Sequence, residues 1–259
     1  MPTFDAPGTT LAYQVEGKGP PVVQLHGLTS CRERDARLGL DLGRSLGRRR
    51  RLLRYDARGH GDSTGVRHPA GYAWHRLADD LLALLDHVFP RQRVHGVGPS
   101  MGTGTLLHAA VRDPQRFASL TLVIPPTAWE TRRVQADAYR ASAHLVEREG
   151  VGAFVELGST APGPPALAGA PTTYPSIAQD LLPTVLRGAA GTDLPPPEVV
   201  AGIDAPTLLL AWTDDPSHPL STATRLHELL PDSRLVVARS PSEVLGWPAL
   251  FADQVAAHS

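Results

Sequence analysis

The sequence is poor in cysteine and lysine. Cys31 is the only cysteine and Lys18 the only lysine among the 259 residues. A single thiol forms no internal disulfide and builds no cysteine-rich metal site. A chain of this length buries enough apolar surface to fold without such supports. We therefore expect a fold held by its hydrophobic core, with no metal and no cofactor, and with Cys31 as an ordinary loop thiol.

The chain also lacks a charge excess and a long apolar run. Its 25 basic and 26 acidic residues leave a formal net charge of −1. This balance provides no electrostatic attraction for nucleic acid or for an anionic membrane surface, so we expect neither as a partner. No apolar run approaches the roughly 20 residues that span a bilayer. Residues 1–13 show no secretory signal, which favours a cytoplasmic protein with a small-molecule substrate; nothing in the sequence indicates its oligomeric state.

Strands and helices alternate along most of the chain. Apolar or alternating stretches predict strands at 9–15, 22–25, 52–55, 94–97, 120–124, 207–211 and 235–238, and helical periodicity predicts helices at 34–46, 74–89, 103–111, 221–230 and 248–257. Such alternation implies right-handed crossovers and a mainly parallel sheet. We predict one α/β domain over residues 1–259, with about eight strands flanked by helices.

One segment departs from this alternation. Residues 125–205 begin with two prolines, end near three more, and are rich in proline, alanine and glycine between 161 and 175. The helical stretches inside the segment are 132–149 and about 177–187. Because strands resume afterwards, we interpret 125–205 as an inserted lid rather than as an independent domain.

A glycine-flanked serine follows the predicted strand at 94–97. The segment reads Gly98-Pro99-Ser100-Met101-Gly102, and a helix is predicted directly after it. A serine nucleophile needs a sharp strand-to-helix turn that lifts it clear of the sheet, and the two glycines leave room for that turn. The helix N-terminus then directs free N–H groups toward a developing oxyanion. This pattern predicts Ser100 as a nucleophile.

Two further motifs follow strands, and together the three carry a resemblance. His26-Gly27-Leu28 follows the strand at 22–25, and Asp56-Ala57-Arg58-Gly59-His60-Gly61-Asp62-Ser63 follows the strand at 52–55. In this order and spacing the motifs resemble the α/β-hydrolase fold superfamily, in particular its serine esterase and lactonase branch. The resemblance implies that the backbone N–H groups of Leu28 and Met101 form the oxyanion hole. It also implies that His26 and His60 are structural.

The catalytic acid of such a family follows the strand after the lid, commonly as Gly-x-x-Asp-x-x-x-Pro. The matching segment here is Trp212-Thr213-Asp214-Asp215-Pro216-Ser217-His218-Pro219. This spacing selects Asp215, with Asp214 as the alternative. Trp212 replaces the usual small residue, and we expect it to narrow the pocket.

The catalytic histidine of the family is absent from its usual place after the last strand. Residues 239–248 contain no histidine, and His258 lies some 15 Å further along a predicted helix at 1.5 Å per residue. Three alternatives remain open. His218 is a candidate base because it follows Asp215 on the same loop. Glu243 is a second candidate, since burial raises the pKa of a glutamate toward neutrality. The third alternative is that no competent base exists.

The leading hypothesis is a serine hydrolase acting on a small carboxylic ester or lactone through an acyl-Ser100 intermediate. A serine without a base is a poor nucleophile, so two rival hypotheses remain. One is a ligand-binding pseudo-enzyme that keeps the pocket without turnover. The other is a lyase or cyclase of specialised metabolism that uses the oxyanion hole without a full triad.

Overall fold

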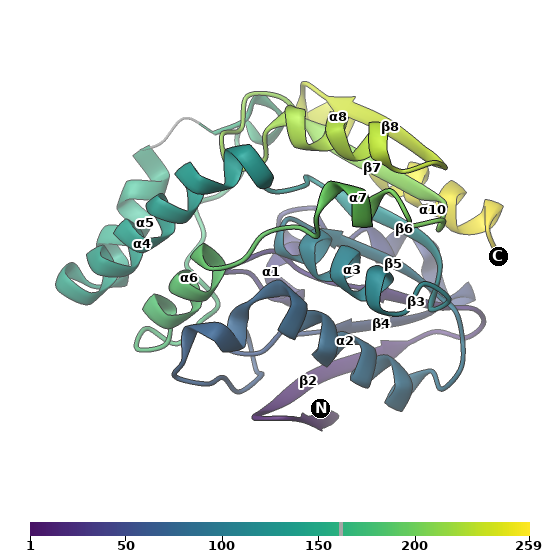
Figure 1. Cartoon of the computed structure of the whole chain (residues 1–259), viewed down its shortest axis with the longest axis horizontal. Helices are drawn as coiled ribbons and strands as arrows, with labels where there is room; N and C mark the ends of the chain where they lie inside the picture. The colour runs from purple at the N-terminus through teal and green to yellow at the C-terminus, as the bar shows by residue number, and fades with distance from the viewer. Residues whose placement is uncertain (161–162) are drawn as a thin grey trace.

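The computed structural model describes residues 1–160 and 163–259, and its centre is one eight-stranded sheet (Figure 1). The strand order is β1-β2-β4-β3-β5-β6-β7-β8. Only the pairs β1–β2 and β2–β4 are antiparallel, and every later pair is parallel. The strands are β1 (Thr3–Ala6), β2 (Thr9–Glu16), β3 (Pro21–Gln24), β4 (Arg51–Tyr55), β5 (Val94–Pro99), β6 (Phe117–Val123), β7 (Thr207–Trp212) and β8 (Ser233–Ala238).

Helices cover both faces of the sheet. Those outside residues 125–205 are α1 (Arg32–Arg37), α2 (Trp74–Val88), α3 (Met101–Arg112), α8 (Leu220–Leu229), α9 (Pro241–Val244) and α10 (Trp247–Ala257), with 3-10 turns η1 (Leu42–Arg49) and η2 (Pro69–Tyr72). Apolar residues of α2, α3 and α8 form one core with one face of the sheet. Apolar residues of η1 and α10 form a second core with the opposite face. The predicted fold class, a mostly parallel sheet of about eight strands between helices, is confirmed.

One predicted helix is wrong. The leucine spacing over 34–46 predicted a single helix, but α1 ends at Arg37 and η1 starts at Leu42. Gly39 lies between them with φ of +73°, a left-handed conformation that ends an α-helix and that glycine adopts without strain. Tertiary packing of Leu40 and Leu42 against the sheet replaces the helical stripe that their spacing suggested.

Residues 125–205, which we call the insert, connect β6 to β7. The insert carries α4 (Arg132–Glu149), α5 (Val151–Thr160), α6 (Leu182–Ala190) and α7 (Pro197–Val200), with 3-10 turns η3 (Trp129–Thr131) and η4 (Pro165–Leu167). Residues 161–162, at the start of its stretch rich in proline, alanine and glycine, lie outside the described residues. The predicted helix at 132–149 agrees with α4. The one predicted at 177–187 instead begins at Leu182, because Pro183 is tolerated only in a first helical turn.

A buried arginine links parts of the insert to one another and to the core. The Arg132 guanidinium donates to the carbonyl oxygens of Thr192 and Ala189 and to Thr127 Oγ1. It also lies 4.4 Å above the ring of Trp74, at the start of α2. An apolar cluster reinforces this connection, since Tyr72 of the core packs among buried residues of α4 and α6.

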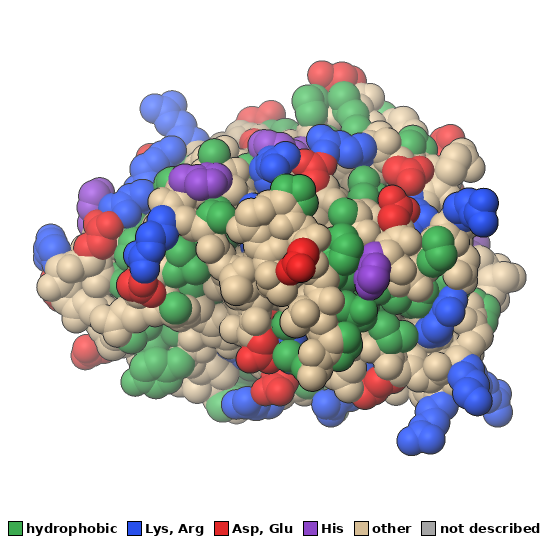
Figure 2. Space-filling view, turned by 90° about the horizontal axis from the view of Figure 1, so that it is seen from below, with side chains coloured by type: hydrophobic (Ala, Val, Ile, Leu, Met, Phe, Trp, Pro, Cys, Tyr) green, Lys and Arg blue, Asp and Glu red, His purple; other side chains and the backbone are tan. Residues whose placement is uncertain are grey.

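The surface carries charges of both signs. Figure 2 shows basic and acidic side chains interspersed over the face seen from below, with no continuous field of one sign on that face. In the part of the chain that the structure describes, no helix has both the length and the apolar character that a membrane crossing requires.

Candidate active site at the serine elbow

Ser100 occupies a strained turn between β5 and α3. Its φ and ψ are +52° and −110°, values that L-residues rarely adopt and that occur mainly where the surrounding structure enforces them. The flanking glycines permit this turn. A Cβ on Gly98 would lie 2.9 Å from the Gly102 carbonyl carbon, and a Cβ on Gly102 would lie 3.0 Å from Leu25 Cβ. The turn therefore needs glycine on both sides of the serine.

The His26-Gly27-Leu28 loop lies beside the elbow. A Cβ built on Gly27 would be 3.8 Å from Ser100 Cβ, so the loop backbone passes close to the serine. Within the described residues, the backbone N–H groups of Leu28 and Met101 donate to no protein acceptor. Met101 is the first residue of α3, where the helix leaves its N–H groups free. The two N–H groups predicted to form an oxyanion hole are thus available for a ligand.

Three polar side chains form a hydrogen-bonded chain at this elbow. His218 Nε2 is 2.8 Å from Ser100 Oγ, and His218 Nδ1 is 2.7 Å from Asp215 Oδ2. A carboxylate only accepts hydrogen bonds, so Nδ1 carries the proton and Nε2 accepts from the serine hydroxyl. Serine, imidazole and carboxylate therefore stand in the order that a serine nucleophile requires.

The short loop after β7 holds both the acid and the imidazole. The backbone N–H of His218 donates to the Asp215 carbonyl at 3.1 Å, and that of Ser217 donates to Asp215 Oδ1 at 2.9 Å. From the start of the insert, the N–H of Thr127 donates to the Ser217 carbonyl at 3.0 Å. Pro219 follows directly and disfavours helical backbone at His218, so α8 begins only at Leu220. The turns within this loop and the Thr127 contact from the insert thus hold the His218 imidazole beside Ser100.

The Asp215 carboxylate is stabilised in its charged form. Burial disfavours that charge, but hydrogen bonds from His218, Trp212 and the Ser217 backbone outweigh it and lower the Asp215 pKa to about 2. The carboxylate is therefore ionised throughout the neutral range. An ionised carboxylate beside Nδ1 favours the tautomer that leaves Nε2 free to accept from Ser100.

Trp212 donates directly to the acid. Its indole Nε1 is 2.9 Å from Asp215 Oδ2, the same oxygen that accepts from His218. From the sequence we expected Trp212 to narrow the pocket, and its bond to Asp215 was not predicted. The structure places the indole in the core, almost fully buried and stacked on Trp247 of α10. A tryptophan in place of a small residue was the available signal, but its rotamer depends on packing that the sequence does not display.

The other candidate residues lie apart from this chain. Glu243 is exposed on α9, and its carboxylate accepts from the backbone N–H of Arg239. Among the described residues it forms no hydrogen bond with Ser100 or His218, so the structure does not bring this candidate base to the serine. Asp214 is exposed, unlike Asp215. Burial is the main reason that the pKa values of His26 and His60 fall to about 4 and about 3; both rings are neutral members of the scaffold.

A buried carboxyl group lies behind the His26-Gly27-Leu28 loop. Asp35 accepts from Ser30 Oγ, and its other oxygen is buried without a partner among the described residues. Burial raises its pKa to about 7, against the opposing hydrogen bonds from Ser30 and the Gly27 backbone. The carboxyl group therefore binds a proton in the folded state at pH values where the unfolded chain has lost it.

We expect the Asp35→Asn substitution to stabilise the protein increasingly as pH rises from about 4 to about 7. The unfolded aspartate ionises near pH 4 and the folded one near pH 7, so the wild type loses stability across this window, by at most about 4 kcal/mol from this group. Denaturant unfolding of both proteins at pH 5 and pH 8 measures the difference. An equal difference at the two pH values would contradict the raised pKa.

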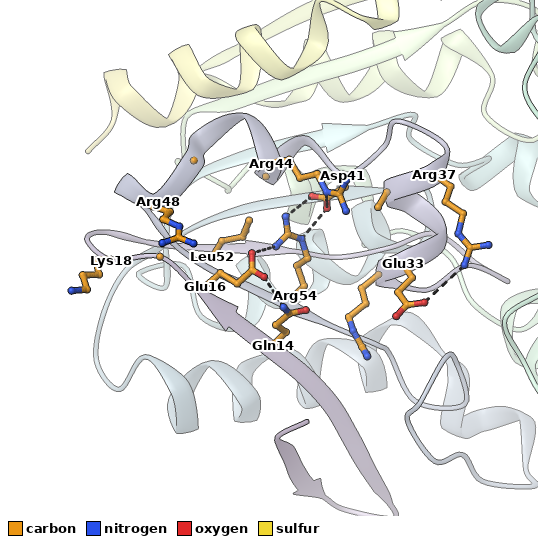
Figure 3. Close-up of a pocket in the computed structure, with 15 residues that line it drawn as sticks. Gln14, Glu16, Lys18, Glu33, Arg37, Asp41, Arg44, Arg48, Leu52 and Arg54 are labelled. Atoms are coloured by element: carbon orange, nitrogen blue, oxygen red, sulfur yellow. Dashed lines mark hydrogen bonds and ion pairs between the residues drawn. The ribbon is translucent and has the colours of Figure 1, made fainter.

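A large cavity lies elsewhere, between β2, β4, α1 and η1 (Figure 3). Its volume is about 1160 Å³, and Ser100, Asp215 and His218 are not among its lining residues. Each carboxylate that lines it is paired with an arginine. Arg54 Nε is 2.9 Å from Asp41 and its Nη1 is 3.3 Å from Glu16, while Arg37 is 3.9 Å from Glu33. These paired charges leave no carboxylate free for acid–base chemistry, so the elbow remains the candidate active site.

Comparison with known proteins connects this architecture to a family. A sequence model described as alpha/beta hydrolase fold matches residues 20–142. A curated protein of Variovorax paradoxus (strain S110), named "Putative carbamate hydrolase RutD", is 35% identical over 116 residues, which are 44% of this chain and 42% of that protein. A second curated relative is matched over only 28% of its own length. The matched segment therefore covers less than half of either curated relative.

Solved structures match over nearly the whole chain. A hydrolase from Pseudomonas aeruginosa PA01 superposes with a TM-score of 0.76 and 26% identity, covering 99% of this chain and 97% of that one. The enol-lactonase from Burkholderia xenovorans LB400 superposes with a TM-score of 0.79 and 23% identity, covering 99% of both chains. The whole described architecture, including the insert, therefore has counterparts among known folds.

Proposed function

We propose that the chain is a serine hydrolase of the α/β-hydrolase fold superfamily and that it cleaves small carboxylic esters or lactones through an acyl-Ser100 intermediate. The observation that carries this proposal is the 2.8 Å hydrogen bond between Ser100 Oγ and His218 Nε2. A serine hydroxyl at its ordinary pKa needs a base within hydrogen-bond reach, and His218 occupies that position. Ser100, His218 and Asp215 are accordingly proposed as the catalytic triad.

The proposed reaction proceeds in two acyl-transfer steps. Ser100 Oγ attacks the acyl carbon while His218 Nε2 takes the hydroxyl proton, and Asp215 stabilises the resulting imidazolium. The N–H groups of Leu28 and Met101 hold the tetrahedral oxyanion. Collapse expels the alkoxide, which takes the proton from His218 and leaves the acyl group on Ser100. A water molecule, deprotonated by His218, then attacks the acyl-enzyme and releases the acid.

The substrate class is supported by the relatives. The enol-lactonase similarity points to lactones, and the name of the curated relative points to acyl transfer to water at a carbamate. All these substrates pass through the same tetrahedral oxyanion, which the free N–H groups of Leu28 and Met101 suit. We favour esters and lactones because an alkoxide leaves with less proton transfer from His218 than an amine requires.

We propose further that the whole chain is one domain and that the insert serves as its lid. Two contacts support a roof over the elbow. The Thr127 N–H bonds the Ser217 carbonyl, and Ser217 Oγ approaches Gln135 Oε1 of α4 to within 3.5 Å. Leu28 packs against both the main core and the apolar cluster that Tyr72 forms with α4 and α6. The His26-Gly27-Leu28 loop therefore lies between the sheet and the insert. Insert residues would then shape the space for the substrate.

The rival hypotheses depended on the lack of a base. The pseudo-enzyme and the lyase or cyclase were considered because no histidine follows the last strand. The hydrogen bonds of His218 to Ser100 and to Asp215 supply the missing group from another loop and weaken both alternatives.

Covalent labelling tests the proposal without knowledge of the substrate. We expect a fluorophosphonate probe to modify the protein stoichiometrically and mass spectrometry to locate the adduct on Ser100, because the probe needs an activated nucleophile and an oxyanion hole. The Ser100→Ala variant is the matched control and should not be labelled. Hydrolysis of p-nitrophenyl acetate and of a panel of simple lactones then compares the substrate classes. Absence of an adduct on a folded wild type would refute the hydrolase assignment.

A further inference from the structure

Trp212 contributes the only indole N–H that donates to the proposed triad among the described residues. Its Nε1 is 2.9 Å from Asp215 Oδ2, and the same oxygen accepts from His218 Nδ1 at 2.7 Å. The second oxygen, Oδ1, accepts from the Ser217 backbone. The N–H groups of Trp212, Ser217 and His218 thus all donate to the Asp215 carboxylate, and together they set the rotamer of its side chain.

Apart from the Thr127 contact with the insert, the loop that carries the acid and the base is held mainly by hydrogen bonds within itself. Asp215 and His218 are three residues apart, and their mutual bonds are turns within one loop. In a triad whose acid and base follow different strands, each strand anchors its own residue. Here a movement of the loop shifts both residues together relative to Ser100. A link from the loop to the rigid sheet is therefore needed to hold the imidazole at 2.8 Å from the serine.

The Trp212 side chain provides that link. Trp212 is the last residue of β7, paired with Ala238 of β8, and its side chain is almost fully buried. Its ring stacks on Trp247 with a centroid separation of 5.9 Å and an interplanar angle of 21°. Trp247 follows β8 and α9, in the region where the family resemblance led us to expect a histidine. Packing from this region therefore immobilises the indole that holds the acid.

We propose that Trp212 is a positioning residue of the active site, whose indole N–H anchors Asp215 to the sheet and thereby aligns His218 with Ser100. An indole N–H only donates, so it anchors a carboxylate without competing for its partner's proton. The hydrogen bond also spreads part of the Asp215 charge onto the indole and limits how strongly the carboxylate attracts the imidazolium. Trp212 then affects both the position of His218 and the negative charge that its imidazole faces.

The test compares two tryptophan-to-phenylalanine variants. Trp212→Phe keeps an aromatic ring in the stack and removes the N–H that bonds Asp215. Trp247→Phe removes the other indole of the stack, whose N–H is buried without a partner among the described residues. Both substitutions replace an indole of the same stack by a phenyl ring. Only Trp212→Phe also removes an N–H bonded to Asp215, so the comparison separates loss of that hydrogen bond from loss of ring packing.

We expect Trp212→Phe to slow fluorophosphonate labelling of Ser100 about 10- to 100-fold, the range for loss of a hydrogen bond to a charged group. The acidic limb of the labelling rate against pH should move to higher pH, because a carboxylate that has lost one hydrogen-bond donor attracts the imidazolium more strongly. Trp247→Phe keeps an aromatic ring in the stack and removes no N–H bonded to Asp215, so it should slow labelling less than Trp212→Phe and leave the acidic limb unmoved. A merely structural role for Trp212 would lower stability without displacing this limb.

A second variant separates the N–H from the ring shape. Benzothienylalanine introduced at position 212 has the shape of tryptophan and no N–H, and we expect it to reproduce the slower labelling and the displaced limb. The anchor would be overturned if Trp212→Phe and the benzothienylalanine variant were both labelled at the wild-type rate with an unmoved acidic limb.

The kinetic readout rests on the proposed function, so an NMR titration of the Asp215 carboxylate complements it. If the wild type is not labelled at all, the hydrolase proposal fails, while the anchor still predicts a higher Asp215 pKa in Trp212→Phe than in the wild type, because the Trp212 hydrogen bond helps to lower that pKa. An unchanged Asp215 titration would then overturn the anchor separately.

Discussion

The His218→Ala variant is expected to lose about 10⁴- to 10⁶-fold in fluorophosphonate labelling and in ester turnover, the range for removal of a triad histidine. His218 is the one base within hydrogen-bond reach of Ser100 among the described residues. Its removal leaves the serine hydroxyl with its proton, while the oxyanion hole and the elbow stay intact. The side chain is about one fifth exposed and its ring lies edge-on to Trp212, so we expect the variant to unfold at a modestly lower temperature while keeping its fold.

Two controls accompany this variant. Glu243→Gln should label at the wild-type rate, since the Glu243 carboxylate faces solvent and bonds the Arg239 backbone. His227→Ala removes an exposed imidazole of α8 that bonds Ser233 Oγ and should likewise have no effect on labelling. If His218→Ala retained labelling and Glu243→Gln lost it, the base would be Glu243 and the proposed triad would be wrong.

The Asp215→Asn variant is expected to lose about 10⁴-fold in turnover, the cost measured for the same change in another serine hydrolase. An amide at this position presents either an N–H or a carbonyl to His218 Nδ1, and it lacks the negative charge that stabilises the imidazolium. The Trp212 N–H and the Ser217 N–H both need acceptors, which the carboxylate supplies with its two oxygens. The amide offers one acceptor oxygen and leaves one of these donors without a good partner.

The stability of this variant should depend on pH in a defined direction. The Asp215 pKa is depressed to about 2 in the folded state, below its unfolded value near 4, so its contribution is fully present above about pH 4. It is lost as pH falls through 2. Denaturant unfolding at pH 7 and at pH 3 should show a smaller penalty for Asp215→Asn at the lower pH.

Asp214→Asn is the matched control for this substitution. Asp214 neighbours Asp215, is exposed, and has φ of +60°, a conformation that asparagine tolerates well. We expect its activity to stay within about twofold of the wild type. A large loss in Asp214→Asn with normal activity in Asp215→Asn would exchange the proposed roles of the two aspartates.

The sequence by itself determined the architecture and the elbow. The strand at 94–97, the glycines at 98 and 102 and the helix that follows are neighbours in the chain, so their pattern directly reports the turn that the structure shows at Ser100. The alternation of strands and helices along the chain likewise predicted a mainly parallel sheet flanked by helices, as the structure shows. Local periodicity failed where a left-handed glycine or a proline interrupts it, as at Gly39 and Pro183.

Only the tertiary structure decided which side chain stands beside Ser100. The sequence left His218 and Glu243 both open, because 118 residues separate Ser100 from His218 and no local pattern reports contacts over that separation. The role of Trp212 depends on a rotamer held by the stack with Trp247, which forms only after β7, β8 and α10 pack together. Hydrogen bonds between distant segments are set by how the elements pack, and the packing is visible only in three dimensions.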